Sequence, residues 1–336
     1  MKRLLRFSAA AWFAVWSFSQ ASLAAAPDTP PTWIDATESE ALVRRLVDQD
    51  GLSEPAVRAL LNEAVYRQDI IDAITRPYEA KPWHQYRQLF VTPTRINGGV
   101  QFWNSHRDLL SQAEARYGVP AEIIVAIIGV ETQYGRNFGR YRVLDALATL
   151  AFAYPPRSRF FLGELEHFMR LIQEEQLDPR QTLGSYAGAM GMGQFIPSSY
   201  RAYAVDFDAD GQRNLWQPAD AIGSVANYFA RHGWTKGAPV AYPAEATTPE
   251  SQALGNQKRE TPHTVAVLRQ AGVRSPAQVP AAQPANLLML DQQEGPEYWL
   301  ALPNFYVITR YNHSVLYAMA VFQLSQEIRH ADQAGP

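Results

Sequence analysis

The chain has no cysteine among its 336 residues. This absence excludes disulfide bonds, thiol nucleophiles, thiolate metal sites and a lipid-modified cysteine behind a leader. The stability of the fold must therefore come from packing. Hydrophobic residues make up 47% of the chain, which is enough for one large core or for two or three smaller ones.

Long hydrophobic runs are also missing, and the one near the N-terminus is too short to predict a transmembrane helix. It follows Lys2, Arg3 and Arg6 and ends near Phe18, before a series of small residues. This arrangement is typical of a cleaved signal peptide, here residues 1–26. We therefore expect an exported, soluble, periplasmic protein with neither a transmembrane segment nor a lipid anchor.

An excess of positive charge is the third feature that the sequence lacks. Without the leader, 27 basic residues face 33 acidic ones, which gives a net charge of about −6. Nucleic acid is therefore a poor candidate partner, because its binding depends on neutralising phosphates with basic side chains. We also expect no organic cofactor.

Most of the mature chain is expected to be helical. Apolar residues recur at three- and four-residue intervals through the region 36–236. The segment 237–300 is rich in Pro, Ala and Gln and contains short β-like runs, which predict a small strand-containing insertion. A helical pattern returns in 301–330, so this last segment is expected to rejoin the main body. The predicted class is mainly α, with some β structure.

The first stretch with chemical potential is IIVAIIGVETQYG, residues 123–135. Pro120 fits the first turn of a helix, and the final glycine fits its end. Glu131 then shares a helix face with the isoleucines three, four and seven positions before it. Burial there raises the pKa of a carboxyl group, as a general acid near neutral pH requires. The alternative is a glutamate that reaches solvent or pairs with Arg136 or Arg140.

A second stretch, SYAGAMGMGQFIPSSY, covers residues 185–200. Its three glycines and two alanines remove side chains, so that a ligand can approach the backbone closely. Gln194 adds an amide that can both donate and accept hydrogen bonds. Tight packing inside a helix is the alternative interpretation.

A third stretch, DFDADGQRNLWQPAD, matches most of an EF-hand calcium loop. Asp206, Asp208 and Asp210 fall on loop positions one, three and five, and Gln212 is placed to offer its backbone carbonyl. Position twelve is a glutamine instead of the usual bidentate glutamate, but Asp220 can supply a carboxylate if the loop is slightly longer. Three carboxylates this close repel one another without a cation, although a solvated acidic turn is the alternative.

The last stretch is YVITRYNHSVLYAMAV, residues 306–321. Tyr311 and Asn312 are expected where a β-like run meets a helix, with Tyr317 on that helix. A tyrosine beside an amide is typical of sugar binding, because a flat ring stacks while polar tips make hydrogen bonds. Half-buried structural tyrosines are the alternative. His313 has no Ser or Asp context and is interpreted as structural.

Four motifs together resemble the lytic murein transglycosylase B family, whose members cleave peptidoglycan: GVETQYG, GAMGMGQFIPSSYRAYAVDFDADG, NLWQPADAIGSVANYFARHGW and LPNFYVITRYNHS. The similarity runs from around residue 85 to residue 328. It implies a lysozyme-like core with an added helical domain and a small β-containing insertion. It also implies a structural calcium ion (Ca²⁺) and glycan strands of peptidoglycan as the partner.

The resemblance further implies roles for individual residues. Glu131 is the expected catalytic acid. The implied substrate-binding positions are Ser185, Gln194, Tyr228, Tyr311, Asn312 and Tyr317. The implied calcium ligands are Asp206, Asp208, Asp210, Gln212 and Asp220.

Two departures from the family pattern are visible. Close relatives have two arginines where this chain has Pro156 and Arg157, which changes the basic contact expected with the stem peptide. The best-known members are lipoproteins, whereas this chain lacks the anchoring cysteine and resembles a soluble form.

The motifs place one carboxylate, whereas ordinary glycosidases use two. One acid suffices if the N-acetyl carbonyl of muramic acid stabilises the anomeric centre and the sugar's own 6-hydroxyl attacks it. The product of cleavage is then a 1,6-anhydromuramic end. A hydrolytic muramidase of the same fold is an alternative and needs a second carboxylate, for which Asp145 is a candidate. A noncatalytic, calcium-dependent glycan-binding protein is another, although a buried acid is costly for binding alone.

Overall fold

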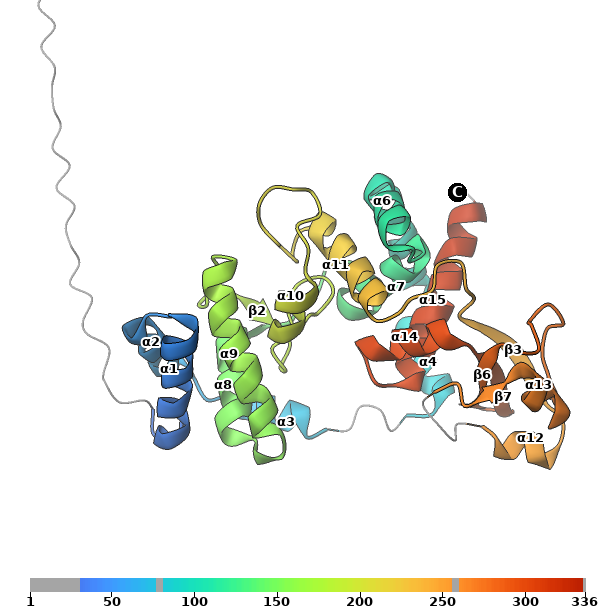
Figure 1. Cartoon of the computed structure of the whole chain (residues 1–336), viewed down its shortest axis with the longest axis horizontal. Coiled ribbons are helices and arrows are strands. Elements are labelled where there is room, and N and C mark those ends of the chain that lie inside the picture. Colours follow the sequence, from blue (N-terminus) through green and yellow to red (C-terminus); the bar gives the residue numbers. More distant parts are fainter. Residues whose placement is uncertain (1–30, 77–80, 256–259, 335–336) are drawn as a thin grey trace, which may run out of the picture.

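Helices form most of the chain in the computed structural model, which describes residues 31–76, 81–255 and 260–334 (Figure 1). The mainly helical class is thus confirmed, while the expected signal peptide lies outside the described residues. No helix of the described part is long and apolar enough to cross a membrane. The helices are α1 (Ala36–Asp50), α2 (Glu54–Glu63), α3 (Gln68–Ile74), α4 (Trp83–Phe90), α5 (Pro93–Ser105), α6 (Arg107–Tyr117), α7 (Ala121–Thr132), α8 (Val143–Ala153), the 3₁₀ helix η1 (Pro155–Arg157), α9 (Ser158–Glu174), α10 (Pro197–Tyr203), α11 (Pro218–Arg231), α12 (Pro249–Ala253), α13 (Val265–Gln270), α14 (Pro303–Tyr311) and α15 (Val315–Ala334).

The helices α1, α2, α8 and α9 lie together on one side of the molecule (Figure 1). Local signals define the first of them: the side chain of Asp35 accepts a hydrogen bond from the backbone N–H of Glu38, and Gly51 ends α1 with a φ of 68°. Helix α1 packs against α9, and α9 packs against α8. This group forms one wall of the recess described below.

Helix α7 lies at the centre of the fold and packs against α5, α6, α11 and α15. Every residue of α7 except Glu131 is buried. An all-round apolar helix is expected to be covered by its neighbours on all sides. The sequence of α7 therefore explains its central position.

The segment after α11 contains most of the β structure. Five antiparallel strands form a sheet in the order β4-β6-β7-β3-β5, and the hairpin of β6 and β7 turns where Gln292 pairs with Gly295. Its inner face covers a second small core that includes Val265, Leu287 and Leu300. A two-stranded ladder, β1 with β2, lies between α7 and α10 in the chain. The strands are β1 (Tyr141–Arg142), β2 (Leu183–Gly184), β3 (Ala241–Ala246), β4 (His263–Thr264), β5 (Val273–Arg274), β6 (Pro284–Gln292) and β7 (Gly295–Ala301).

One local expectation from the sequence is wrong. The run before Asn312 is not β-like, because it forms α14, which begins with Pro303. The side chain of Asn304 fixes this helix start by accepting from the N–H of Thr235 and donating to the carbonyl of Ala238. The alternative interpretation of the glycine-rich stretch 185–196, packing inside a helix, does not hold, since this stretch forms turns and an antiparallel bridge between Met190 and Phe195.

Candidate active site

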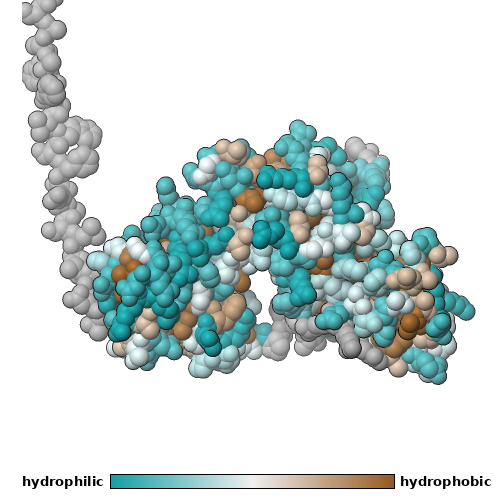
Figure 2. All heavy atoms as spheres, viewed as in Figure 1, coloured by the Kyte–Doolittle hydropathy of each residue, from teal (hydrophilic) through white to brown (hydrophobic). Residues whose placement is uncertain are grey.

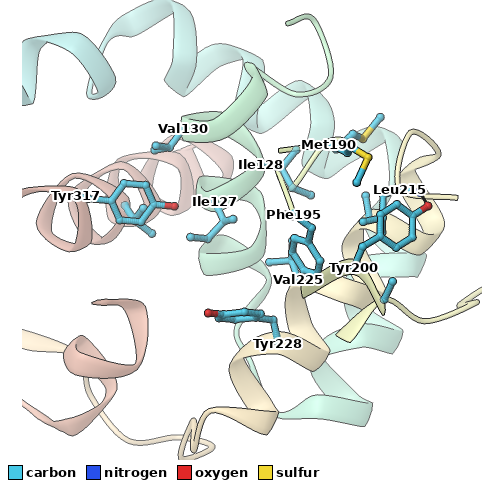
Figure 3. Packing of buried hydrophobic residues seen from close by; sticks show 14 of the residues in the cluster. Ile127, Ile128, Val130, Met190, Phe195, Tyr200, Leu215, Val225, Tyr228 and Tyr317 are labelled. Carbon is cyan, nitrogen blue, oxygen red and sulfur yellow. Dashed lines mark hydrogen bonds between the residues drawn. The ribbon is translucent and has the colours of Figure 1, made fainter. Parts of the chain in front are cut away.

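Glu131 lies in the last turn of α7, where the buried helix reaches the surface. Its Oε1 atom accepts a hydrogen bond of 2.6 Å from the hydroxyl of Tyr317 on α15. Figure 3 shows this hydroxyl directed from α15 towards α7. Neither Arg136 nor Arg140 forms an ion pair with Glu131 in the part of the chain that the structure describes.

The surroundings of Glu131 favour its neutral form. Burial raises the pKa of Glu131 from 4.5 to about 7, although the hydrogen bond from Tyr317 acts in the opposite direction. Burial, followed by the nearby charge of Glu131, raises the pKa values of Tyr317 and Tyr311 well above 10. Both phenols therefore stay protonated and can donate hydrogen bonds, while Glu131 can hold or release a proton near neutral pH.

This pKa shift predicts a pH-dependent loss of stability. Since the folded-state pKa of Glu131 lies above the unfolded value, the folded state binds more protons between about pH 4.5 and pH 7, and its stability falls as the pH rises through that window. We expect Glu131→Gln to match the wild type at about pH 5 and to be up to about 3 kcal/mol more stable at about pH 9. Urea unfolding at both pH values measures this difference. Equal stability of the two proteins at high pH would contradict the shift.

A sharp turn follows Glu131 and orients the end of α7. Gln133, Tyr134 and Gly135 have φ values of 51°, 63° and 80°, so two bulky residues adopt the left-handed conformation. The hydroxyl of Thr132 donates to the carbonyl of Met192 over 2.9 Å and accepts from the N–H of Gly135. Long-range contacts therefore stabilise a turn that its own residues disfavour.

The ring of Tyr134 fills a space that glycines leave open. A Cβ atom at Gly98, Gly99 or Gly129 would lie within 3.0 Å of this tyrosine. Its hydroxyl donates to the carbonyl of Arg95 over 2.7 Å. Neither Tyr134 nor Thr132 was predicted from the sequence as a site residue. The signal for Tyr134 was present in the Gly-Gly pair inside α5, because glycines within a helix often mark a close approach.

The glycine-rich loop is fixed by the polar side chains that were assigned to substrate. The hydroxyl oxygen of Ser185 accepts from the N–H groups of Ala187 and Ala189. Gln194 has a φ of 51°, and its side-chain amide donates to the carbonyls of Phe138 and Gly191 over 3.3 and 3.0 Å. These two side chains shape the loop.

Aromatic rings connect this loop to α11 and α14. The hydroxyl of Tyr311 donates to the carbonyl of Gly193 over 2.5 Å, and the hydroxyl of Tyr228 donates to the carbonyl of Arg310 over 2.6 Å. The two tyrosine rings meet edge to face, with centroids 4.8 Å apart. Phe195 packs between α7 and Tyr228 (Figure 3).

A cavity of about 570 Å³, which we call the cleft cavity, opens beside these rings. Figure 2 shows the molecule hollowed between its α8–α9 side and its α14 side. The cavity brings together four of the expected substrate-binding residues, Gln194, Tyr228, Tyr311 and Asn312, and Arg157 also lines it. Tyr317 instead contacts Glu131, and Ser185 lies in the loop without lining this cavity.

Three of the acidic side chains expected to bind calcium come together in the loop between α10 and α11. One carboxylate oxygen each from Asp206, Asp208 and Asp220 lies within 4.8 Å of the others. Asp220 is buried in the first turn of α11 and accepts from the N–H groups of Phe207 and Asn214. Burial raises its pKa, the two backbone bonds lower it, and the neighbouring carboxylates raise it further.

Asp210, the fourth carboxylate expected to bind calcium, is placed differently. The carboxylate of Asp210 accepts from the N–H of Gln212 and does not belong to the group of three within the described residues. Oxygen ligands at this spacing, with one of them buried, fit a hard divalent cation such as calcium. Three of the four carboxylates expected as ligands are therefore assembled among the described residues.

Comparison with known proteins agrees with this geometry. A family model described as a transglycosylase SLT domain matches residues 35–326. The chain belongs to this family. The membrane-bound lytic murein transglycosylase B of Escherichia coli (strain K12) is 46% identical over 300 residues, which are 86% of this chain and 82% of the relative. The family resemblance seen in the sequence is thus confirmed, and the chain is a lytic transglycosylase.

Solved structures of family members have the same fold. Catenated SltB1 from Pseudomonas aeruginosa is 48% identical with a TM-score of 0.85, and the match covers 89% of this chain and 99% of that one. Slt35 from Escherichia coli, solved in complex with calcium, is 44% identical with a TM-score of 0.83 and coverages of 91% and 97%. SltB3 from Pseudomonas aeruginosa, solved with NAG-anhNAM-pentapeptide, is 29% identical with a TM-score of 0.78 and coverages of 88% and 80%. The expected lysozyme-like transglycosylase fold is confirmed.

Proposed function

We propose that this lytic transglycosylase cleaves the β-1,4 bond between MurNAc and GlcNAc in peptidoglycan and leaves 1,6-anhydromuramic ends. The observation that carries the proposal is the single carboxyl group of Glu131, whose pKa is raised to about 7 beside Tyr317. Among the described residues, no second carboxylate is close enough to contribute to that shift. This arrangement suits one group that acts first as an acid and then as a base.

The proposed reaction needs no water. Glu131 donates its proton to the glycosidic oxygen as the bond from that oxygen to C1 of MurNAc breaks, and the N-acetyl carbonyl stabilises the electron-poor C1. The 6-hydroxyl oxygen of the same sugar then bonds to C1 and returns its proton to Glu131. Such positioned intramolecular attack lowers a barrier by about 7 kcal/mol or more in ideal cases. The hydroxyl of Tyr317 donates to Glu131 and can stabilise its charged form between the two steps.

The cleft cavity offers the contacts that would position the sugar. Tyr228 and Tyr311 present aromatic rings, while Gln194 and Asn312 provide amides. We assign these four residues to glycan binding, with Ser185 shaping the loop and Tyr317 contacting the acid. In the distant relative SltB3, the bound ligand itself contains an anhydromuramic unit, which supports the same product here.

The hydrolytic alternative requires a second carboxylate, and Asp145 is poorly suited to that role. It is buried, accepts from the N–H of Val65 over 2.9 Å, and forms an ion pair of 2.5 Å with Arg142. A carboxylate engaged in this way connects α8 to the chain after α2. We therefore assign Asp145 to structure.

The products decide between the two reactions. We expect purified peptidoglycan treated with the protein to release fragments that are one water lighter than those from a lysozyme and that lack a reducing end at the cut. Mass spectrometry of the fragments, with lysozyme digestion as the control, measures this. Mainly reducing muramic ends would refute the transglycosylase mechanism.

We propose further that Asp206, Asp208 and Asp220 bind a structural calcium ion, with Asp210 and the backbone carbonyl of Gln212 as additional ligands. The three converging carboxylates support this, and so does the family member Slt35, which was solved in complex with calcium. The ion would offset the repulsion between the carboxylates and join α10 to α11. It would take no part in proton transfer.

Removal of calcium is expected to lower thermal stability. A ligand that binds only the folded state adds about 2.7 kcal/mol at a hundred times its Kd, which corresponds to a fall of about 5 °C in Tm when a chelator removes it. Calorimetry with and without the chelator measures the change. The double variant Asp206→Asn, Asp208→Asn is the control and should show no calcium dependence. If the wild type had the same Tm in both conditions, the three carboxylates would not bind calcium and would form an ordinary acidic surface turn.

The proposed substrate lies outside the cytoplasmic membrane, so the protein must be exported to reach it. The expected leader at residues 1–26 would direct this export, and its cleavage would leave the mature chain in the periplasm. N-terminal sequencing of the protein from a periplasmic fraction tests the proposal. A full-length chain recovered only from the cytoplasm would contradict it.

A further inference from the structure

A second cavity, of about 700 Å³, lies between the end of α9, strand β2, the turn after α7 and the metal loop. We call it the α9 cavity. None of its lining residues belongs to the cleft cavity. Phe138 lines the α9 cavity, and its carbonyl accepts from the side chain of Gln194, which lines the cleft cavity. In Figure 1, the loop before α11 lies on the side of the molecule away from the recess seen in Figure 2.

The walls of the α9 cavity combine rings with amides. Tyr200 is fully buried, while Phe138 and Trp216 are half-buried, and Leu183 exposes 43% of its surface. Five amide side chains surround these apolar groups, one of which is the half-buried Asn214. The other four, Asn137, Gln176, Gln181 and Gln212, are exposed. Aromatic surfaces rimmed by amides suit the apolar faces and the hydroxyl and acetamido groups of an N-acetylated sugar.

The charges in the α9 cavity also favour a neutral ligand. The guanidinium of Arg213 pairs with the carboxylate of Glu175, which is itself largely buried. The carboxylate of Asp178 accepts a hydrogen bond from the side chain of Gln181. The exposed Arg136, which also lines the cavity, carries the opposite charge. A strongly acidic or basic peptide would therefore meet a like charge on one side of the cavity.

Gln176 lines the cavity from a helix end that glycine usually occupies. It follows the last turn of α9 with a φ of 53°, and the N–H of Leu177 donates back to the carbonyl of Ile172 over 3.1 Å. Glycine is the usual residue at such a helix end, and a side chain there costs about 1 kcal/mol. Within the described residues, the amide of Gln176 makes no hydrogen bond to the protein, and the same is true of Gln212. The strain lies in the backbone of Gln176, and its exposed side-chain amide is available to a ligand in the cavity.

We propose that the α9 cavity is a second glycan-binding site, which binds an N-acetylated sugar chain of the cell wall outside the cleft where cleavage occurs. The identification of this ligand as a glycan of the cell wall rests on the proposed function. A glycan bound there would anchor the enzyme to the wall through a segment that is not being cut. The cleft and the α9 cavity would then contact two different stretches of glycan.

The test measures co-sedimentation with purified cell-wall sacculi in the Glu131→Gln background, so that nothing is digested. Gln176→Gly removes the amide and relieves the backbone, and Leu183→Asp places a charge on the exposed wall of the cavity. We expect each change to weaken binding about two- to tenfold, because the loss of one polar or apolar contact typically has an effect of this size. Gln173→Ala, an exposed glutamine of α9 that does not line the cavity, is the matched control and should bind as the parent does.

Two further measurements separate this site from the cleft and from peptide binding. With Glu131 intact, Gln176→Gly should cleave short soluble glycan fragments with unchanged kcat and KM, and its Tm should be equal to or above that of the wild type. Sacculi freed of stem peptides by an amidase should bind as well as untreated sacculi. Any one of three results would overturn the proposal. Both cavity variants could co-sediment as the parent does, they could fail to cleave soluble fragments, or sacculi without stem peptides could fail to bind. Failure of the proposed function would appear separately, in the masses of the products.

Discussion

Replacing Glu131 by glutamine lowers the rate of peptidoglycan cleavage by about a hundredfold to ten-thousandfold, the usual cost of losing a general acid. The amide keeps the shape of the side chain but has no proton to give to the glycosidic oxygen. It can still interact with the hydroxyl of Tyr317, so the fold around α7 is preserved. The release of soluble fragments from sacculi measures the rate.

Glu122→Gln is the matched control for this change. Glu122 lies on the same helix, is also buried, and pairs with Arg329 far from the cleft cavity. We expect its variant to retain cleavage within a few-fold of the wild type, at some cost in stability. Lysis by Glu131→Gln at the wild-type rate would remove Glu131 from the mechanism and direct attention to another carboxylate.

The second large effect is expected at Tyr134, where Tyr134→Ala lowers the free energy of unfolding by about 3 kcal/mol. Removing the ring leaves a cavity against Gly98 and Gly129, which cannot be refilled by side chains. The hydrogen bond to the carbonyl of Arg95 is lost as well. Because Tyr134 stabilises the left-handed turn directly after α7, cleavage should also fall as Glu131 loses its fixed position. Urea unfolding and the sacculus assay measure the two effects.

Two variants show which part of Tyr134 matters. Tyr134→Phe keeps the ring and loses only the hydroxyl, so we expect a loss of about 1 kcal/mol. Tyr66→Ala removes a tyrosine that exposes 38% of its surface, and it should change stability less than Tyr134→Ala does. If Tyr134→Ala were as stable as Tyr66→Ala, the glycines of α5 and α7 would have no role in supporting the turn.

The sequence predicted those features that depend on neighbouring residues. The apolar run before Glu131 predicted a buried helix with a carboxylate at its end, because such a run has no polar face to expose. The aspartates after α10 predicted a metal loop, since their spacing is a property of a short segment. The spacing did not reveal which carboxylates converge: among the described residues, Asp206, Asp208 and Asp220 lie within 4.8 Å of one another, and Asp210 is not in this group.

Features that depend on distant residues were not predictable. The run before Asn312 has β-branched and aromatic residues and was expected to be β-like, yet contacts of Asn304 with the chain after α11 favour a helix there. The left-handed conformation of Tyr134 is unfavourable locally and exists because glycines elsewhere accept the ring. The α9 cavity is formed by four segments that are far apart in the sequence.

The hydrogen bond between Glu131 and Tyr317 joins residues that are 186 positions apart. The contact can form only when the end of the chain is present, because α15 donates the hydroxyl. Helix α15, which carries Tyr317 and packs against α5 and α7, is the last helix of the described chain. An unfinished chain, or one clipped before α15, would leave Glu131 exposed to water and with an ordinary acidity. The acidity of Glu131 would thus depend on a helix far from it in the sequence.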